Sequence, residues 1–117
     1  MEGHVSIQDS IRGVGIAILK SKIFPMFLFT ILVVYVGSFL EISIVEWLLI
    51  VFCVSILMSL EVINTSIELL CNIVEPNENR KIKEIKDISA GAVLISAISS
   101  VLIGMVIFIP KLVGLFC

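Results

Sequence analysis

The sequence predicts an all-α integral membrane protein, in which an N-terminal amphipathic surface helix precedes three transmembrane helices. Of its 117 residues, 59% are hydrophobic and 15% are charged, and the mean hydropathy is +1.19. A soluble domain of this length rarely has such a composition. The apolar residues also gather in three runs, each long enough to cross the hydrocarbon core of a bilayer. We therefore expect residues 1–117 to form a single membrane domain.

The surface helix is predicted over about residues 6–22. Its apolar residues recur at spacings of four, three and four and so share one narrow face: Ile7, Ile11, Val14 and Ile18. A helix with such a face lies in the membrane interface, with its apolar side toward the lipid tails. A frayed, disordered leader is the alternative interpretation of the same residues.

Three transmembrane helices follow, which we predict at about residues 23–40, 45–71 and 89–109. Pro25 falls in the first turn of the first span, where a missing backbone N–H costs no hydrogen bond. Trp47 marks the start of the second span, because indole rings favour the headgroup level of a bilayer. We expect Pro110 and Lys111 to end the third span.

The basic residues predict the orientation of the chain. Seven of the eight flank one side of the predicted membrane: Arg12, Lys20 and Lys22 before the first span, and Arg80, Lys81, Lys83 and Lys86 in a polar loop predicted at residues 74–86. Cytoplasmic loops of membrane proteins carry an excess of Lys and Arg. We therefore expect the N-terminus and this loop to lie in the cytoplasm.

Small residues repeat every four positions along the third span: Ala92, Ser96, Ser100 and Gly104. Small side chains at this spacing allow helix backbones to approach closely. The ridge predicts a packed and oligomeric helix bundle. Chance is the alternative explanation, because the helix is rich in Ala, Ser, Ile and Val.

Cysteine and histidine give no sign of a metal site. The three cysteines lack the spacing of zinc ligands, and we expect them to act as small apolar side chains: Cys53, Cys71 and Cys117. His4 stands alone in the polar leader, so we assign it no ligand role.

A polar stripe interrupts the second span. Four polar residues fall within roughly 80° of the helix circumference: Glu61, Asn64, Glu68 and Asn72. Glu61 lies about 21 Å and Glu68 about 31 Å beyond Trp47 along the helix axis, toward the cytoplasmic interface. A carboxylate near the bilayer centre costs on the order of 3 kcal/mol. A bound cation or a proton is the usual compensation.

Such a stripe fits chemistry between a lipid in the membrane and a phosphate donor in the cytoplasm. Glu61 can take a proton from a lipid hydroxyl, and Glu68 can hold a divalent cation. Lys86 can bind a phosphate as a point charge. These positions alone leave three hypotheses open, namely lipid chemistry, a proton-coupled transporter and a structural or assembly role.

Two blocks of the sequence resemble a known family, the small membrane-integral prokaryotic diacylglycerol kinases, which include the undecaprenol kinases. The signature of that family resembles Glu61-x-x-Asn64-Thr65-x-x-Glu68. Its second block is similar to Lys86-Asp87-Ile88-Ser89-Ala90-Gly91-Ala92-Val93-Leu94. The distance between the blocks agrees with the family, as do Glu46-Trp47 and the Ile-Phe-Ile-Pro-Lys sequence that ends at Lys111. The resemblance covers about residues 6–112.

The resemblance implies a homotrimer in the bacterial cell membrane, with a cytoplasmic N-terminus and active sites shared between neighbouring subunits. It implies transfer of the γ-phosphate of ATP, with Mg²⁺, to a lipid alcohol such as diacylglycerol or undecaprenol. The implied partners are therefore ATP, the lipid alcohol, the membrane and further copies of the chain, with no nucleic acid. The Ala-Gly-Ala form of the second block more closely resembles the undecaprenol branch.

The resemblance also implies roles for five residues. Glu61 corresponds to the catalytic general base, and Glu68 corresponds to a metal ligand. Asn64 is implied as a polar support at the nucleotide and the metal. Lys86 is implied as a phosphate-binding residue, and Asp87 as a carboxylate on the nucleotide side.

Two positions depart from the family pattern. The pattern has a metal-ligand glutamate near the end of the surface helix, where this chain has Ser21, and an aspartate where it has Asn72. Loss of a carboxylate weakens binding of a divalent cation unless phosphate or water supplies the missing oxygens. We therefore expect a lipid kinase. The alternatives are a degenerate member that binds lipid or nucleotide with little turnover, and a small proton-coupled transporter.

Overall fold

The computed structural model describes residues 6–77 and 79–117, and within these residues the chain forms helices and no strand. The helices are α1 (Ile7–Lys20), α2 (Ile23–Leu40), α3 (Ile44–Val74) and α4 (Arg80–Phe116). The last three are each long and apolar enough to cross a membrane. These features confirm the predicted all-α membrane fold. His4 and Glu78, which lies in the predicted polar loop, are outside the described residues.

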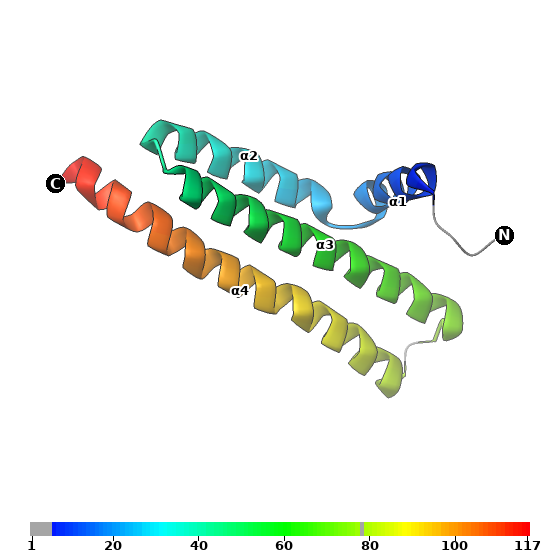
Figure 1. Cartoon of the computed structure of the whole chain (residues 1–117). Helices are drawn as coiled ribbons and strands as arrows, with labels where there is room; N and C mark the ends of the chain where they lie inside the picture. The colour runs from blue at the N-terminus through cyan, green and yellow to red at the C-terminus, as the bar shows by residue number, and fades with distance from the viewer. Residues whose placement is uncertain (1–5, 78) are drawn as a thin grey trace.

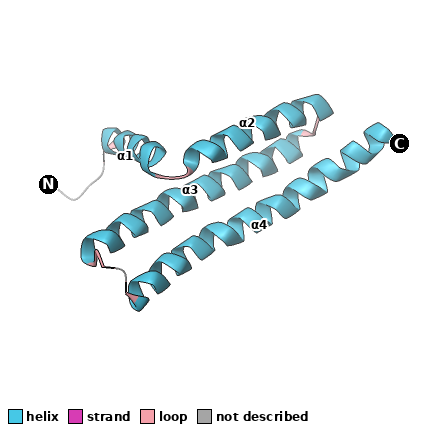
Figure 2. Cartoon of the chain, turned by 180° about the vertical axis from the view of Figure 1, so that it is seen from behind, coloured by secondary structure: helices cyan, strands magenta, loops and turns pink. Residues whose placement is uncertain are grey.

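The three long helices lie side by side, with α3 between α2 and α4 (Figures 1 and 2). The shorter α1 lies beside the start of α2, toward the same end of the bundle as the α3–α4 connection (Figure 1). Large apolar side chains remain exposed on all three long helices, among them Phe27, Phe52 and Val106. An exposed apolar surface of this extent is typical of contact with a membrane or with another protein chain.

Side-chain caps mark the starts of α1 and α3. The Ser6 hydroxyl accepts a hydrogen bond from the Asp9 N–H (3.1 Å) at the start of α1. At the start of α3, the Ser43 hydroxyl accepts from the Glu46 N–H (3.2 Å), and the Glu46 carboxylate accepts from the Ser43 N–H (2.8 Å). These bonds satisfy donors that the first turn of a helix leaves free. Between α2 and α3, Glu41 adopts a left-handed conformation (φ 53°), which turns the chain tightly.

The prediction of a polar loop at residues 74–86 is wrong. Helix α3 continues to Val74 and α4 already begins at Arg80, so the connection between them is short. The early start follows from Asn79, because its side-chain oxygen accepts a hydrogen bond from the Ile82 N–H (2.9 Å) and caps the helix. The basic residues expected in the loop therefore lie on the first turns of α4.

The helix that carries the predicted third span extends beyond Pro110 and Lys111, where we expect the span itself to end. Helix α4 continues through Pro110 to Phe116, at the cost of the one hydrogen bond that proline cannot donate. Lys111 forms an ion pair with Glu46 at the start of α3 (Nζ to Oε1, 3.4 Å), and both side chains are partly exposed. This pair holds the final turns of α4 against α3.

Helices α2 and α3 approach closely at Gly37. A Cβ added there would lie 2.9 Å from Cη2 of Trp47 and 3.1 Å from Cδ1 of Ile42. We expect Gly37→Val to lower the free energy of unfolding by about 1–3 kcal/mol, which is typical of overpacking. Thermal unfolding in detergent micelles measures the change. Gly104→Val is the matched control, since a Cβ at Gly104 meets no atom within 4 Å. Equal free energies of unfolding for the two variants would contradict the close approach at Gly37.

Candidate active site

The polar stripe of α3 begins inside the protein and ends at its surface. Glu61, Asn64 and Thr65 are 7%, 6% and 8% exposed, respectively. Glu68 and Asn72, further along the helix, are exposed. About 16 Å of helix axis separates Glu61 from Asn72. The stripe therefore joins a buried carboxylate to exposed side chains on the surface of the chain.

Glu61 is held at the joint between α1 and α2. Its Oε2 accepts a hydrogen bond from the backbone N–H of Lys22 (3.4 Å), and the Thr65 hydroxyl lies 3.5 Å from the same oxygen. The Thr65 hydroxyl also donates to the Glu61 carbonyl oxygen (3.0 Å), and its single proton serves one acceptor at a time. Lys22 immediately precedes α2. Backbone N–H groups at such a position lack helical partners and lie at the positive end of the helix dipole, so the joint suits a carboxylate.

Asn64 links the buried part of the stripe to Glu68. Its Nδ2 donates a hydrogen bond to Glu68 Oε1 (2.9 Å). Its Oδ1 is buried and, in the part of the chain that the structure describes, accepts no hydrogen bond. A buried acceptor without a partner costs free energy unless a ligand or a water molecule satisfies it. Within the described residues, the stripe therefore contains a buried amide oxygen without a partner, at Asn64, and an exposed carboxylate, at Glu68.

A magnesium ion at Glu68 and Asn64 would need further oxygens from a phosphate or from water, because these two residues alone are too few to hold it. Within residues 6–77 and 79–117, no group of three or more His, Cys, Asp or Glu side chains could hold a metal ion. Mg²⁺ is often bound by one or two carboxylates together with substrate phosphates and water. Glu68 with Asn64 meets that requirement. Glu61 precedes Glu68 by about two helical turns, and its carboxylate contacts the Lys22 N–H and the Thr65 hydroxyl instead.

The first two residues of the second sequence block, Lys86 and Asp87, have different surroundings. Lys86 Nζ donates a hydrogen bond to Asn72 Oδ1 (2.8 Å) across the interface of α3 and α4, and so reaches the end of the stripe. Asp87 instead forms an ion pair with Lys83 on α4 (3.2 Å), and both side chains are 65% exposed. Successive residues of a helix point about 100° apart, which explains why these neighbours face different directions. The structure therefore brings Lys86 to the stripe and leaves Asp87 on the surface of α4.

Ser21, where the resemblance leads one to expect a glutamate, ends α1. Its hydroxyl donates to the Ala17 carbonyl oxygen (2.6 Å), and the next residue, Lys22, contacts Glu61 through its backbone. The position therefore adjoins the stripe, but it brings no carboxylate to it.

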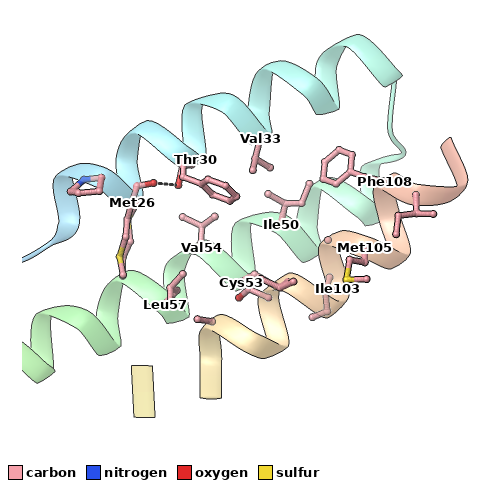
Figure 3. A pocket seen from close by; sticks show the side chains of 18 residues that line it. Met26, Thr30, Val33, Ile50, Cys53, Val54, Leu57, Ile103, Met105 and Phe108 are labelled. Atoms are coloured by element: carbon pink, nitrogen blue, oxygen red, sulfur yellow. Dashed lines mark hydrogen bonds between the residues drawn. The ribbon is translucent and has the colours of Figure 1, made fainter. Parts of the chain in front are cut away.

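An apolar groove of about 540 Å³ lies between α2, α3 and α4 (Figure 3). Leu57 and Met58 line the groove about one helical turn before Glu61, and Met26 lines it from the first turn of α2. The groove therefore ends close to the buried carboxylate. It is not lined by any of the five residues that the sequence predicts for the site, and it does not extend to Lys86.

The sequence carries only a weak signal for this groove. Among the small residues repeated along the last helix, Ser100 and Gly104 line the groove, whereas Ser96 is buried (8% exposed). A Cβ added at Gly104 would meet no atom within 4 Å. The small residues at 100 and 104 therefore leave space between α2 and α4, instead of bringing these two helices together.

Known proteins resemble this chain over most of its length. Residues 8–108 match the family model described as prokaryotic diacylglycerol kinase. An undecaprenol kinase of Bacillus subtilis is 40% identical over 76 residues, which cover 65% of this chain and 62% of the relative. A diacylglycerol kinase of Synechocystis sp. is 28% identical over 113 residues, which cover 95% of this chain and 65% of the relative. The chain thus spans less than two-thirds of the length of these curated relatives. No solved structure matches it.

Proposed function

This chain belongs to the prokaryotic diacylglycerol kinase family, and from that membership we propose that it is a lipid kinase that transfers a phosphoryl group from ATP to a membrane lipid alcohol. The relatives named above are an undecaprenol kinase and a diacylglycerol kinase, and these two lipids define the class of alcohol that we propose. One observation carries the proposal: Glu61 is a buried carboxylate at the end of an apolar groove.

The groove and Glu61 would bind different parts of the lipid. Binding of an apolar chain in the groove is favourable, and it becomes more so as more apolar surface leaves water or a less well packed environment. With its chain in the groove, the lipid would bring its hydroxyl close to Glu61. The carboxylate then accepts the hydroxyl proton as a general base. The Lys22 N–H and the Thr65 hydroxyl hold that carboxylate in position.

On the side of the phosphate donor, we assign roles to four residues. Mg²⁺ bound with ATP supplies positive charge that neutralises the phosphate oxygens. Glu68 and the amide oxygen of Asn64 would hold this ion, and Lys86 would bind a phosphate as a point charge. Asp87 acts on the nucleotide side, and its exposed ion pair with Lys83 is weak enough to open for a nucleotide.

Neighbouring copies would complete the site, in the homotrimer that the resemblance implies. Within one chain the groove ends near Glu61 and does not extend to Lys86. The lipid and the phosphate donor therefore lack a shared enclosed cavity in a single subunit. The exposed apolar faces of α2 and α4 offer a surface that another copy can cover.

We propose the bacterial cell membrane as the location, with the N-terminus in the cytoplasm. The end of α1 and the start of α4 lie toward one end of the bundle (Figure 1). The basic residues Lys20, Lys22 and Lys83 therefore belong to that end, in agreement with the positive-inside rule. ATP would then reach Lys86 from the cytoplasm, while the lipid stays in the bilayer.

A degenerate family member, which binds lipid or nucleotide with little turnover, is the second candidate function. Ser21 favours this alternative, because its hydroxyl is engaged with Ala17 and α1 brings no carboxylate to the stripe. A small proton-coupled transporter is the third candidate, since an intramembrane glutamate is typical of proton pathways.

Glu61→Gln tests the general base. The amide keeps the size of the carboxylate but cannot accept the proton, so we expect the rate of lipid phosphorylation to fall by about 10²–10⁴-fold. The rate is measured with radiolabelled ATP, Mg²⁺ and a panel of lipid alcohols, on purified protein in lipid nanodiscs. Glu84→Gln, at an exposed position of α4, is the control and should keep the wild-type rate.

Each candidate function gives a different result in this experiment. A normal rate for Glu61→Gln would rule out the proposed base. Wild-type protein that binds ATP but labels no lipid in the panel would favour the degenerate member. Flux in vesicles that follows a proton gradient and ignores ATP would favour the transporter.

Gly104→Leu tests the groove. The new side chain enters space that we assign to the lipid chain, so we expect the KM for the lipid to rise by about tenfold while the KM for ATP stays constant. Initial rates at varied concentrations of each substrate measure the two constants. Gly114→Leu is the matched control, since a Cβ there also meets no atom within 4 Å and Gly114 does not line the groove. An unchanged KM for the lipid in Gly104→Leu would contradict this use of the groove.

A further inference from the structure

The hydrogen bond between Lys86 and Asn72 joins the two helices that carry the proposed phosphate-donor site. Lys86 Nζ lies 2.8 Å from Asn72 Oδ1, on the first turns of α4 and the last turns of α3, respectively. The lysine is half-buried, whereas the asparagine is exposed. The bond therefore fixes a cationic group at a place that a water-soluble anion can approach.

Asn72 directs this ammonium group toward the polar stripe. It follows Glu68 by four residues, so the two side chains lie on the same face of α3. An ammonium group has three donors, and the bond to Asn72 occupies one of them. Two N–H groups thus remain for a phosphate.

A second lysine on α4 shows the alternative arrangement. Lys83 forms an ion pair with Asp87 at 3.2 Å on the exposed surface of the same helix. The partner of that lysine lies one turn away on its own helix, whereas the partner of Lys86 lies on α3. Of the two lysines, only Lys86 is therefore held across the interface of α3 and α4.

We propose that Asn72 is a positioning residue, whose side-chain oxygen holds the Lys86 ammonium in place for the phosphate of the nucleotide. This proposal rests on the proposed function. A lysine side chain has many rotamers, and fixing it before the ligand arrives lowers the entropic cost of binding. The role requires an acceptor oxygen at position 72, which aspartate also supplies.

The test compares three single variants of the full-length protein in lipid nanodiscs. Asn72→Ala removes the acceptor, and we expect it to weaken MgATP binding and to raise the KM for ATP about tenfold, with kcat within about twofold of wild type. Asn72→Asp keeps an acceptor and should stay within about threefold of wild type. Asn77→Ala, in the α3–α4 connection, is the matched control and should bind ATP normally. Displacement of a fluorescent ATP analogue measures binding, and initial rates measure KM and kcat.

A double variant shows whether Asn72 acts through Lys86. Lys86→Met removes the ammonium but keeps most of the apolar stem, so adding Asn72→Ala to it should cause no further loss of ATP binding. An additive loss in the double variant would overturn the proposal. Normal binding by Asn72→Ala, or an equal loss in Asn72→Asp and Asn72→Ala, would also overturn it.

The binding measurements separate this proposal from the proposed lipid kinase activity. If the wild type binds ATP but phosphorylates no lipid, the kinase activity is contradicted, while the comparison of ATP affinities still decides the role of Asn72. If the wild type binds no ATP, both proposals are overturned.

Discussion

A carboxylate enclosed by apolar helices needs donors close by, and the surroundings of Glu61 show how this chain provides them. The break between α1 and α2 leaves the Lys22 N–H free at the start of a helix, and this N–H contacts the carboxylate. Thr65, one turn further along α3, adds a hydroxyl. The placement of α1 therefore has a physical reason beyond its amphipathic pattern: its end brings the joint with α2 against the buried acid.

Helix α3 connects two different environments. Its middle lines an apolar groove, and its last turns carry an amide, a carboxylate and the acceptor for Lys86. A reaction between a lipid and a water-soluble phosphate donor needs both environments near one another. In a single chain the groove ends near Glu61, whereas Asn72, with its partner Lys86, lies about three helical turns further along α3. The proposed proton transfer therefore centres on Glu61, and we expect neighbouring copies to enclose the rest of the site.

The sequence was sufficient for features that depend on composition and periodicity. Three apolar runs predicted the three long helices, and the 3.6-residue period placed Glu61 and Asn64 on one face. The sequence-based prediction failed where a single contact decides where a helix begins. The charged residues at 80–86 indicated a loop, but the Asn79 side chain caps α4 and starts the helix at Arg80. The groove was also missed, because it depends on how far α2 and α4 separate, a distance that no local pattern contains. Asn72 departs from the family pattern, and only its contact with Lys86 shows that it still supplies an acceptor oxygen.

The most direct measurement of the central claim is an experimental structure of the protein in a lipid bilayer, with a lipid alcohol and a non-hydrolysable ATP analogue bound. If Glu61 is the general base, the lipid chain occupies the groove and its hydroxyl oxygen lies within about 2.6–3.2 Å of the Glu61 carboxylate. A lipid hydroxyl bound far from Glu61, with the groove filled by a helix of a neighbouring copy, would contradict it.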